Sequence, residues 1–176
     1  SNLDNVFFTH CNWRPHKRLR NICDGFLKAL DMGLDADLVI AGDPDYKIKH
    51  NRIKYVGWIE NKSLKSYLSR SIATIHLAWI DWCPNAMVES IVANCPLIYS
   101  NSGGSADVGM GSGIPIADVQ WNFKPCKHYN PPTLNHEEIA KAMIKLLDGY
   151  EMKPKNNFDI KHIATNYLHF FKDILG

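Results

Sequence analysis

Short apolar runs alternate with longer amphipathic segments along the chain. The runs hold about four to six apolar residues, the usual length of a strand that is buried on both faces. Between them, apolar residues recur every three or four positions, as Leu19, Ile22 and Phe26 do, which is the spacing of one helix face. The pattern predicts an α/β fold, a doubly wound parallel sheet of the Rossmann-like kind. The predicted strands are Val6–Thr9, Leu38–Ala41, Ile53–Val56, Ile72–Leu77, Pro96–Ser100 and Ile114–Ala117.

Several predicted helices have recognisable ends. Gly33 is the expected stop of the first helix, and Asn135 is the expected N-cap of a periodic helix that ends at Gly149. Ile160–Leu175 forms a last amphipathic helix that is rich in aromatic residues. The connections are too short to hold a second domain and the chain has no internal repeat. We therefore expect residues 1–176 to form one domain.

Polar loops follow the predicted strands. In open parallel sheets, ligands bind in the crevice outside the carboxyl ends of the strands. We therefore expect these loops to converge on one binding crevice. The loops are residues 10–18, 42–45, 57–61, 78–85 and 101–105.

The segment after the fourth strand predicts a helix start that suits an anion. Pro84 fits the first position of a helix, where its missing N–H costs nothing. The N–H groups of Asn85 and Ala86 would then be free at the positive end of the helix, which favours a bound anion.

Glu89 lies on this predicted helix, away from its apolar side. The predicted buried stripe is Val88, Ile91, Val92 and Cys95, which recur at helical spacing. Glu89 could therefore face the crevice as a ligand-binding carboxylate, or simply be a solvated surface charge.

The loop after the first strand is basic. It carries Arg14, Lys17 and Arg18, and a cation there, opposite the helix start, would suit a diphosphate. A solvated basic turn is the alternative.

Three further residues allow two interpretations each. Trp58, after the third strand, could form the wall of a base pocket or pack against the protein. Gly103 and Gly104 could approach a ligand closely or form an ordinary turn.

Composition excludes some classes of function. A formal net charge of +2 and a pI near 8.2 do not call for a nucleic-acid partner. No apolar run is long enough to span a bilayer, and no signal peptide opens the chain. Five cysteines without a C-x-x-C pair predict free thiols and a cytoplasmic location, and the histidines lack metal-ligand spacing, so we expect no metal site.

Common nucleotide and hydrolase motifs are also missing. The chain has no G-x-G-x-x-G, no G-x-x-x-x-G-K-[ST] and no G-x-S-x-G. A dinucleotide fold, a P-loop and a serine hydrolase are therefore not supported.

Taken in order, these segments resemble the C-terminal, donor-binding half of retaining glycosyltransferases of the two-domain GT-B fold, and family 4 most closely. The resemblance covers nearly the whole chain. The family's Arg…Lys pair falls on Asn12 and Lys17, so one cation is replaced by an amide. The family's paired acids, Glu-x7-Glu, fall on Asp81 and Glu89, so the first acid is shorter. The segments P-N-x-x-x-E, C-P-L-I-Y-S-N-S-G-G and V-G-W-I also match the family pattern.

The resemblance implies a role for each site residue. Glu89 would accept hydrogen bonds from the ribose hydroxyls of a nucleotide sugar, and Asp81 from hydroxyls of the donor sugar. Lys17 and the N–H groups of Asn85, Ala86 and Met87 would stabilise the departing diphosphate, without a metal or another cofactor. The region of Trp58 and Ile59 would hold the base, in part through backbone groups.

The resemblance also implies that a second domain is needed. A complete enzyme of this kind has an N-terminal domain that binds a carbohydrate or glycoconjugate acceptor. This chain lacks it, so we expect it to bind a nucleotide sugar and to transfer sugar poorly alone. Peripheral attachment to a membrane, if there is any, would come through that domain.

Two other functions compete with this interpretation. Asn12 and Asp81 would also fit a catalytically degenerate member that serves as a nucleotide-binding or interaction module. An unrelated α/β sensor domain ranks last, because such domains carry acidic residues at the end of the first strand and this chain has none there.

Overall fold

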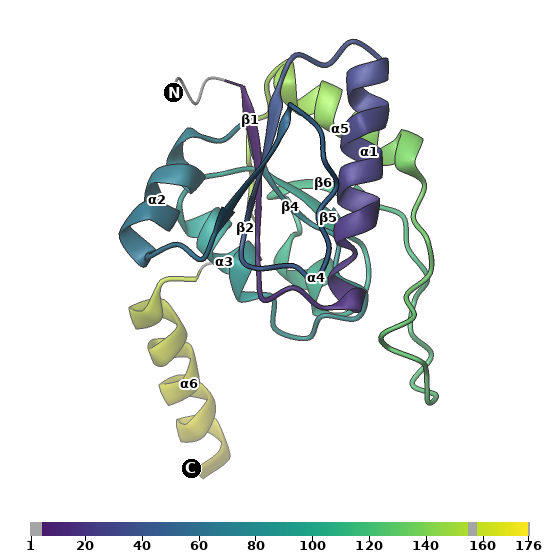
Figure 1. Ribbon diagram of the computed structural model, residues 1–176. Coiled ribbons are helices and arrows are strands. Elements are labelled where there is room, and N and C mark those ends of the chain that lie inside the picture. Colours follow the sequence, from purple (N-terminus) through teal and green to yellow (C-terminus); the bar gives the residue numbers. More distant parts are fainter. Residues whose placement is uncertain (1–4, 155–157, 176) are drawn as a thin grey trace.

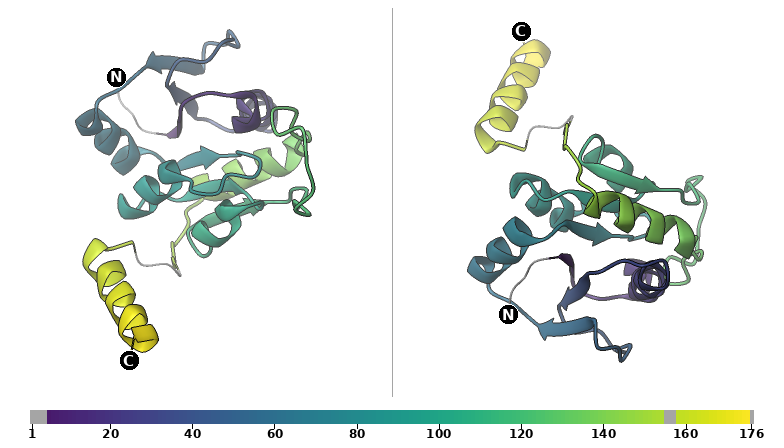
Figure 2. Two further views of the ribbon diagram at one scale, coloured as in Figure 1. Left: turned by 90° about the horizontal axis from the view of Figure 1, so that it is seen from below. Right: turned by 90° about the horizontal axis from the view of Figure 1, so that it is seen from above.

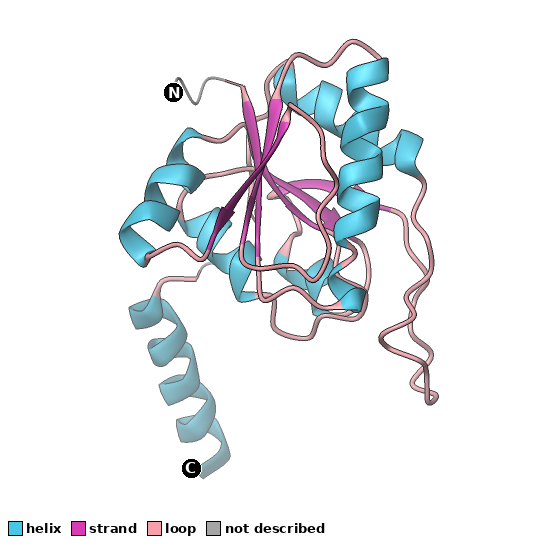
Figure 3. Ribbon diagram, in the orientation of Figure 1, coloured by secondary structure: helices cyan, strands magenta, loops and turns pink. Residues whose placement is uncertain are grey.

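The computed structural model describes residues 5–154 and 158–175, and within them the chain forms one parallel sheet between two layers of helices (Figure 1, Figure 3). The strands are β1 (Val6–His10), β2 (Asp37–Ala41), β3 (Ile53–Gly57), β4 (Ala73–His76), β5 (Leu97–Ser100) and β6 (Gly113–Ile116). Their order in the sheet is β3-β2-β1-β4-β5-β6, and every pairing is parallel. The predicted fold, an α/β fold with a doubly wound parallel sheet of the Rossmann-like kind, is confirmed.

Most of the helices pack on one of the two faces of the sheet. They are α1 (Leu19–Asp31), α2 (Asn61–Arg70), α3 (Asn85–Val92), α4 (Gly104–Val108), α5 (His136–Leu147) and α6 (Ile160–Leu175), with a short 3-10 helix, η1 (Pro15–Lys17). Helices α1 and α5 pack together on one face, where Phe7, Leu38 and Ile75 join them in the largest apolar cluster. The opposite face is covered by α2 and α3, which contact Phe8 and Leu97 respectively. Figure 2 shows the same layers from above and below.

The last helix differs from the others. Figures 1 and 2 show α6 standing away from the sheet, and none of its residues is buried. Its aromatic side chains are therefore exposed. No described helix, α6 included, combines the length and apolar character needed to cross a bilayer.

Two local predictions need correction. The stripe predicted on α3 is wrong at Val92, which is 70% exposed, because the helix buries Met87, Ser90 and Ile91 instead. Gly104 does not sit in an ordinary turn but begins the short helix α4. The five cysteines are free thiols, as expected.

Candidate functional site

A cavity of about 370 Å³ lies at the carboxyl edge of the sheet, where β1 and β4 lie side by side. The loop after β1 and the segment between β4 and α3 form most of its wall. Of the five loops predicted to converge, loops 10–18 and 78–85 meet here, and the other three supply no lining residue. The lining residues are His10, Cys11, Asn12, Arg14, His16, Lys17, His76, Asp81, Cys83, Pro84, Asn85, Ala86 and Glu89.

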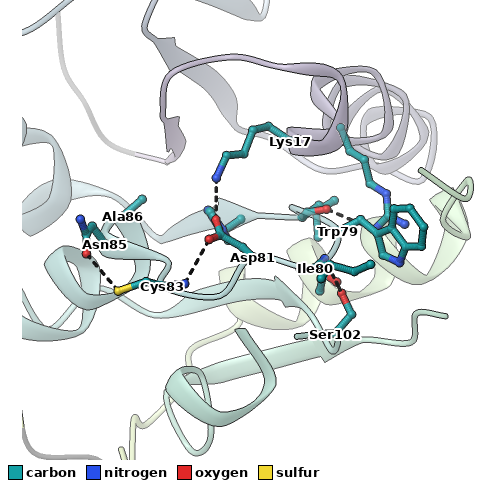
Figure 4. A network of polar contacts seen from close by, with 12 residues as sticks. Lys17, Trp79, Ile80, Asp81, Cys83, Asn85, Ala86 and Ser102 are labelled. Atoms are coloured by element: carbon teal, nitrogen blue, oxygen red, sulfur yellow. Dashed lines mark hydrogen bonds and ion pairs between the residues drawn. The ribbon is translucent and has the colours of Figure 1, made fainter. Parts of the chain in front are cut away.

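The Asp81 carboxylate is the centre of the polar contacts in this cavity. Lys17 Nζ lies 2.5 Å from its Oδ2, and His76 Nε2 lies 3.1 Å from the same oxygen. The other oxygen, Oδ1, accepts a hydrogen bond of 3.3 Å from the Cys83 N–H. Figure 4 shows Lys17 reaching across to Asp81 from the opposite wall. The predicted lysine and the first predicted acid therefore form one ion pair.

These contacts fix the charges of the cluster. Burial raises the pKa of Asp81, but the hydrogen bonds from His76 and Lys17 lower it more, so the carboxyl stays ionised. Burial lowers the pKa of His76, which is 5% exposed, and the charge of Lys17 lowers it further. A neutral His76 donates its Nε2–H to the carboxylate, since an ionised carboxylate can only accept.

The backbone around Asp81 is held in an unusual conformation. Ile80 has a φ of 53°, in the left-handed region that a β-branched residue rarely adopts. Its N–H donates to Ser102 Oγ at 3.3 Å, and Asp81 forms a parallel bridge with Gly103. A Cβ on Gly104 would meet the Trp82 carbonyl oxygen at 2.3 Å. The two glycines therefore allow the Asp81 loop to pack closely, and neither lines the cavity.

The start of α3 differs from the prediction. Pro84 is the N-cap rather than the first helical residue, and the Asn85 N–H donates to the Cys83 carbonyl at 2.9 Å. The Met87 N–H donates to the Pro84 carbonyl at 2.9 Å, and its side chain is buried in the core. Of these three amides, only that of Ala86 has no partner within the described residues. The helix start offers a single amide to an anion.

Glu89 lies on the cavity wall. Its side chain is 47% exposed, and partial burial raises the pKa of its carboxyl. Its Oε2 lies 3.8 Å from His10 Nδ1 at the end of β1. Burial and the neighbouring His76 lower the pKa of His10 to about 4, so His10 is neutral at pH 7.

The basic residues of the first loop separate in the structure. Arg14 lines the cavity and donates to the Tyr129 hydroxyl at 3.3 Å, and Asn12 also lines it. Arg18 is fully buried, with its guanidinium 2.5 and 3.0 Å from the two carboxylate oxygens of Asp118. The prediction of Arg18 as a diphosphate ligand is therefore wrong, because its guanidinium is buried in an ion pair with Asp118.

The proposed base-binding residues also lie outside this cavity. Trp58 is 68% exposed, and Ile59 packs beside the apolar cluster of α2. Neither is among the lining residues.

Sequence reasoning missed His76, and it assigned no role to His16. His76 is the last residue of β4, whose four residues are all buried, and an ionisable side chain near the carboxyl end of a predicted buried strand was the available signal. His16 is buried in a stack with His128, at 4.3 Å between ring centroids. No group of three or more His, Cys, Asp or Glu in the described ranges is arranged to hold a metal ion.

Comparison with known proteins identifies the fold. No protein-family model and no curated protein sequence matches the chain. Among solved structures, WaaG, a glycosyltransferase involved in lipopolysaccharide biosynthesis, matches with a TM-score of 0.60 and 13% identity, over 84% of this chain and 39% of that one. Sucrose-phosphate synthase from Thermosynechococcus elongatus matches with a TM-score of 0.61 and 15% identity, over 85% and 38%. Anabaena Alr3699/HepE, in complex with UDP and glucose, matches with 0.58 and 11%, over 97% and 49%.

These neighbours are much longer than this chain, which spans half of their length or less. At such low identity the likeness establishes the fold alone. The chain has the fold found in glycosyltransferases, with its cavity at the carboxyl edge of the sheet.

Proposed function

We propose that this chain is the donor-binding domain of a retaining glycosyltransferase, which transfers a hexose from a nucleotide-diphosphate sugar to an acceptor hydroxyl. The observation that carries the proposal is the placing of Lys17, Asp81, Glu89 and the start of α3 around one cavity. The fold shared with glycosyltransferases supports the same function.

The diphosphate would lie between Lys17 and the start of α3. Lys17 and Arg14 supply the positive charges that line the cavity, and the Ala86 N–H supplies a backbone donor at the positive end of a helix. These groups would stabilise the charge that develops on the leaving diphosphate, so no metal ion is required by the proposal.

Glu89 would hold the ribose. Its carboxylate has two acceptor oxygens, which suits the neighbouring hydroxyls of a ribose, and nearly half of its side chain is open to solvent. Partial burial disfavours the ionised form of Glu89, which is why its pKa is raised. Hydrogen bonds from ligand hydroxyls to the carboxylate would stabilise the ionised form again.

Asp81 would hold both Lys17 and the sugar. A carboxylate can accept about four hydrogen bonds, and Asp81 receives those from Lys17, His76 and the Cys83 N–H. Capacity for a donor-sugar hydroxyl remains on Oδ1. The configuration at the anomeric carbon of the sugar would be retained because the acceptor hydroxyl attacks from the same face that the diphosphate leaves.

The acceptor would be bound elsewhere. The matched glycosyltransferases are roughly twice as long as this chain or more. We therefore propose that a further domain supplies the acceptor site, and that these 176 residues alone bind donor but transfer sugar slowly.

Calorimetric titration of the chain with UDP, GDP and ADP tests the binding step. We expect one of the three to bind, and Lys17→Met to weaken it at least tenfold, because the diphosphate loses its nearest cation. Lys145→Met on α5, outside the cavity, is the matched control and should bind as the unchanged chain does. If none of the three binds, or if Lys17→Met binds normally, the donor site as proposed does not exist.

The second candidate function is a degenerate module that binds nucleotides or a partner without transferring sugar. Two observations favour this module. Asn12 stands where the family has a cation, and Lys17 is already paired with Asp81. Tight nucleotide binding combined with no sugar transfer, even after an acceptor domain is supplied, would support the module and exclude the enzyme.

A further inference from the structure

The charges around Asp81 balance without any ligand. The described residues that line the cavity carry two cations, Lys17 and Arg14, and two acids, Asp81 and Glu89. Lys17 already contacts Asp81 at 2.5 Å, with both side chains mostly buried. A diphosphate entering the cavity would therefore compete with Asp81 for the same ammonium group. If Lys17 turns to the diphosphate, Asp81 becomes a largely buried carboxylate without its cation, which is strongly unfavourable unless another group compensates.

We propose, on the premise that this cavity binds a nucleotide sugar, that His76 is the positioning residue for Asp81. Its imidazole holds the Asp81 carboxylate while Lys17 turns to the diphosphate, and it takes up the proton that replaces the lysine charge. One proton moves from solvent to Nδ1 of His76, the nitrogen that does not face Asp81, and no other bond forms or breaks.

The position of His76 suits this role. It ends β4 in the centre of the sheet, is almost fully buried, and points its Nε2 at Asp81 Oδ2 from 3.1 Å. Its side chain is 5% exposed and has less room to move than a long lysine side chain that reaches across the cavity.

The surrounding groups determine the direction of the proton transfer. His76 faces Lys17 from η1, Asp81 from the following loop and His10 from β1, with Glu89 of α3 beyond His10. Tyr99 is its register partner on β5. Burial and Lys17 lower the pKa of His76, whereas Asp81 raises it. When Lys17 turns away, one lowering contribution weakens and the raising one remains, so the pKa of His76 rises on binding, in the direction of proton uptake.

Proton uptake predicts that nucleotide-sugar affinity rises as pH falls. A nucleotide sugar is the right probe because its diphosphate lacks the terminal phosphate ionisation, near pKa 6, that a free nucleotide has. The whole chain is titrated with UDP-glucose, GDP-glucose and ADP-glucose at pH 6 and pH 8. Each titration is repeated in two buffers with different ionisation enthalpies, and the difference in observed enthalpy gives the number of protons taken up.

The unchanged chain should take up protons and bind roughly three- to tenfold more tightly at pH 6 than at pH 8. His76→Gln retains an N–H donor, so at pH 8 it should bind more tightly than His76→Leu, but it should take up no proton. His76→Leu should lose at least tenfold in affinity at both pH values, because Asp81 is no longer held. His169→Gln, an exposed histidine of α6, is the control and should change neither quantity.

Each contrary result has a separate meaning. Binding without proton uptake in the unchanged chain overturns the role of His76 and leaves the proposed function intact. Uptake that persists in His76→Gln, or that disappears in His10→Gln, assigns the proton to another group and also overturns it. If no nucleotide sugar binds at either pH, the proposed function fails and this inference fails with it.

Discussion

Buried histidines surround the proposed donor site, and their low basicity affects the stability of the whole protein. Burial and the charge of His76 lower the pKa of His10 to about 4. Burial, together with His128 and Lys17, lowers the pKa of His16 to about 4 as well. In an unfolded chain a histidine has a pKa of about 6.5. Between these values the unfolded chain binds more protons than the folded one, so acid favours unfolding.

We therefore predict that the free energy of unfolding falls as pH drops from about 6.5 to about 4. The contribution of each histidine is complete above pH 6.5 and falls by up to roughly 3 kcal/mol near pH 4. Urea unfolding at pH 7.5 and pH 5 measures the change. His10→Gln and His16→Gln should each reduce the difference between the two pH values, whereas the exposed His169→Gln should not. Equal pH dependence in all four chains would show that these imidazoles are not held neutral.

Residues that belong to a family motif could be singled out from the sequence, but their contacts could not. The resemblance to GT-B glycosyltransferases implied roles for Lys17, Asp81 and Glu89, and the structure brings all three to one cavity. The sequence could not indicate that Lys17 and Asp81 pair with each other, since a linear pattern gives no side-chain distances. Arg18 was misassigned for a related reason. Its partner, Asp118, lies far along the chain and meets it only when β6 is placed at the edge of the sheet.

At the scale of elements, the close packing of α4 against the loop after β4 controls where Asp81 lies. Gly104 starts α4 with its Cα beside the Trp82 backbone, and Gly103 bridges to Asp81. Because both contacts involve backbone rather than flexible side chains, neither side can move aside without displacing the loop.

We predict that Gly104→Ala lowers stability by about 1–3 kcal/mol, because the added methyl group must push the Trp82 carbonyl away. It should also weaken nucleotide binding, since Asp81 moves with its loop. Thermal unfolding and calorimetry measure the two effects. Gly149→Ala, at the end of α5 where a methyl group meets open space, is the control. It should lose up to about 1 kcal/mol through backbone strain but retain full binding. Normal binding by Gly104→Ala would show that this contact does not position the site.

The sequence predicted which segments form strands and which form helices better than it predicted the residues at which they begin and end. Each predicted strand is present in the structure. A run of four to six apolar residues is typical of a strand in a parallel sheet that is covered on both faces. The predicted start of α3 was one residue early. The Asn85 N–H donates to the Cys83 carbonyl, a contact that helix propensities do not predict. Helix α4 was missed because five residues are too few to show a helical period.

At the scale of the whole molecule, the carboxyl edge of the sheet was predictable and the strand order was not. Parallel strands joined by helices must end at one edge, so polar loops gather there whatever the order. Only β1 and β4 are neighbours at the centre, which explains why two of the five predicted loops form the cavity. The loops after β2 and β3 lie further out and supply no lining residue.

The exposed last helix allows a direct test of where the stable unit ends. Phe158 and Met152 pack against the apolar cluster of α3, whereas no residue of α6 is buried. Burial of apolar surface is the main source of stability. A chain that ends after Asp159 should therefore unfold within about 0.5 kcal/mol of the full chain in urea, and should bind nucleotide with the same affinity. A chain shortened further, so that Phe158 is also removed, is the matched comparison and should lose about 1–3 kcal/mol. If loss of α6 alone lowers stability by several kcal/mol, that helix packs on the domain in solution, and the sheet with its two layers of helices is not a complete folding unit.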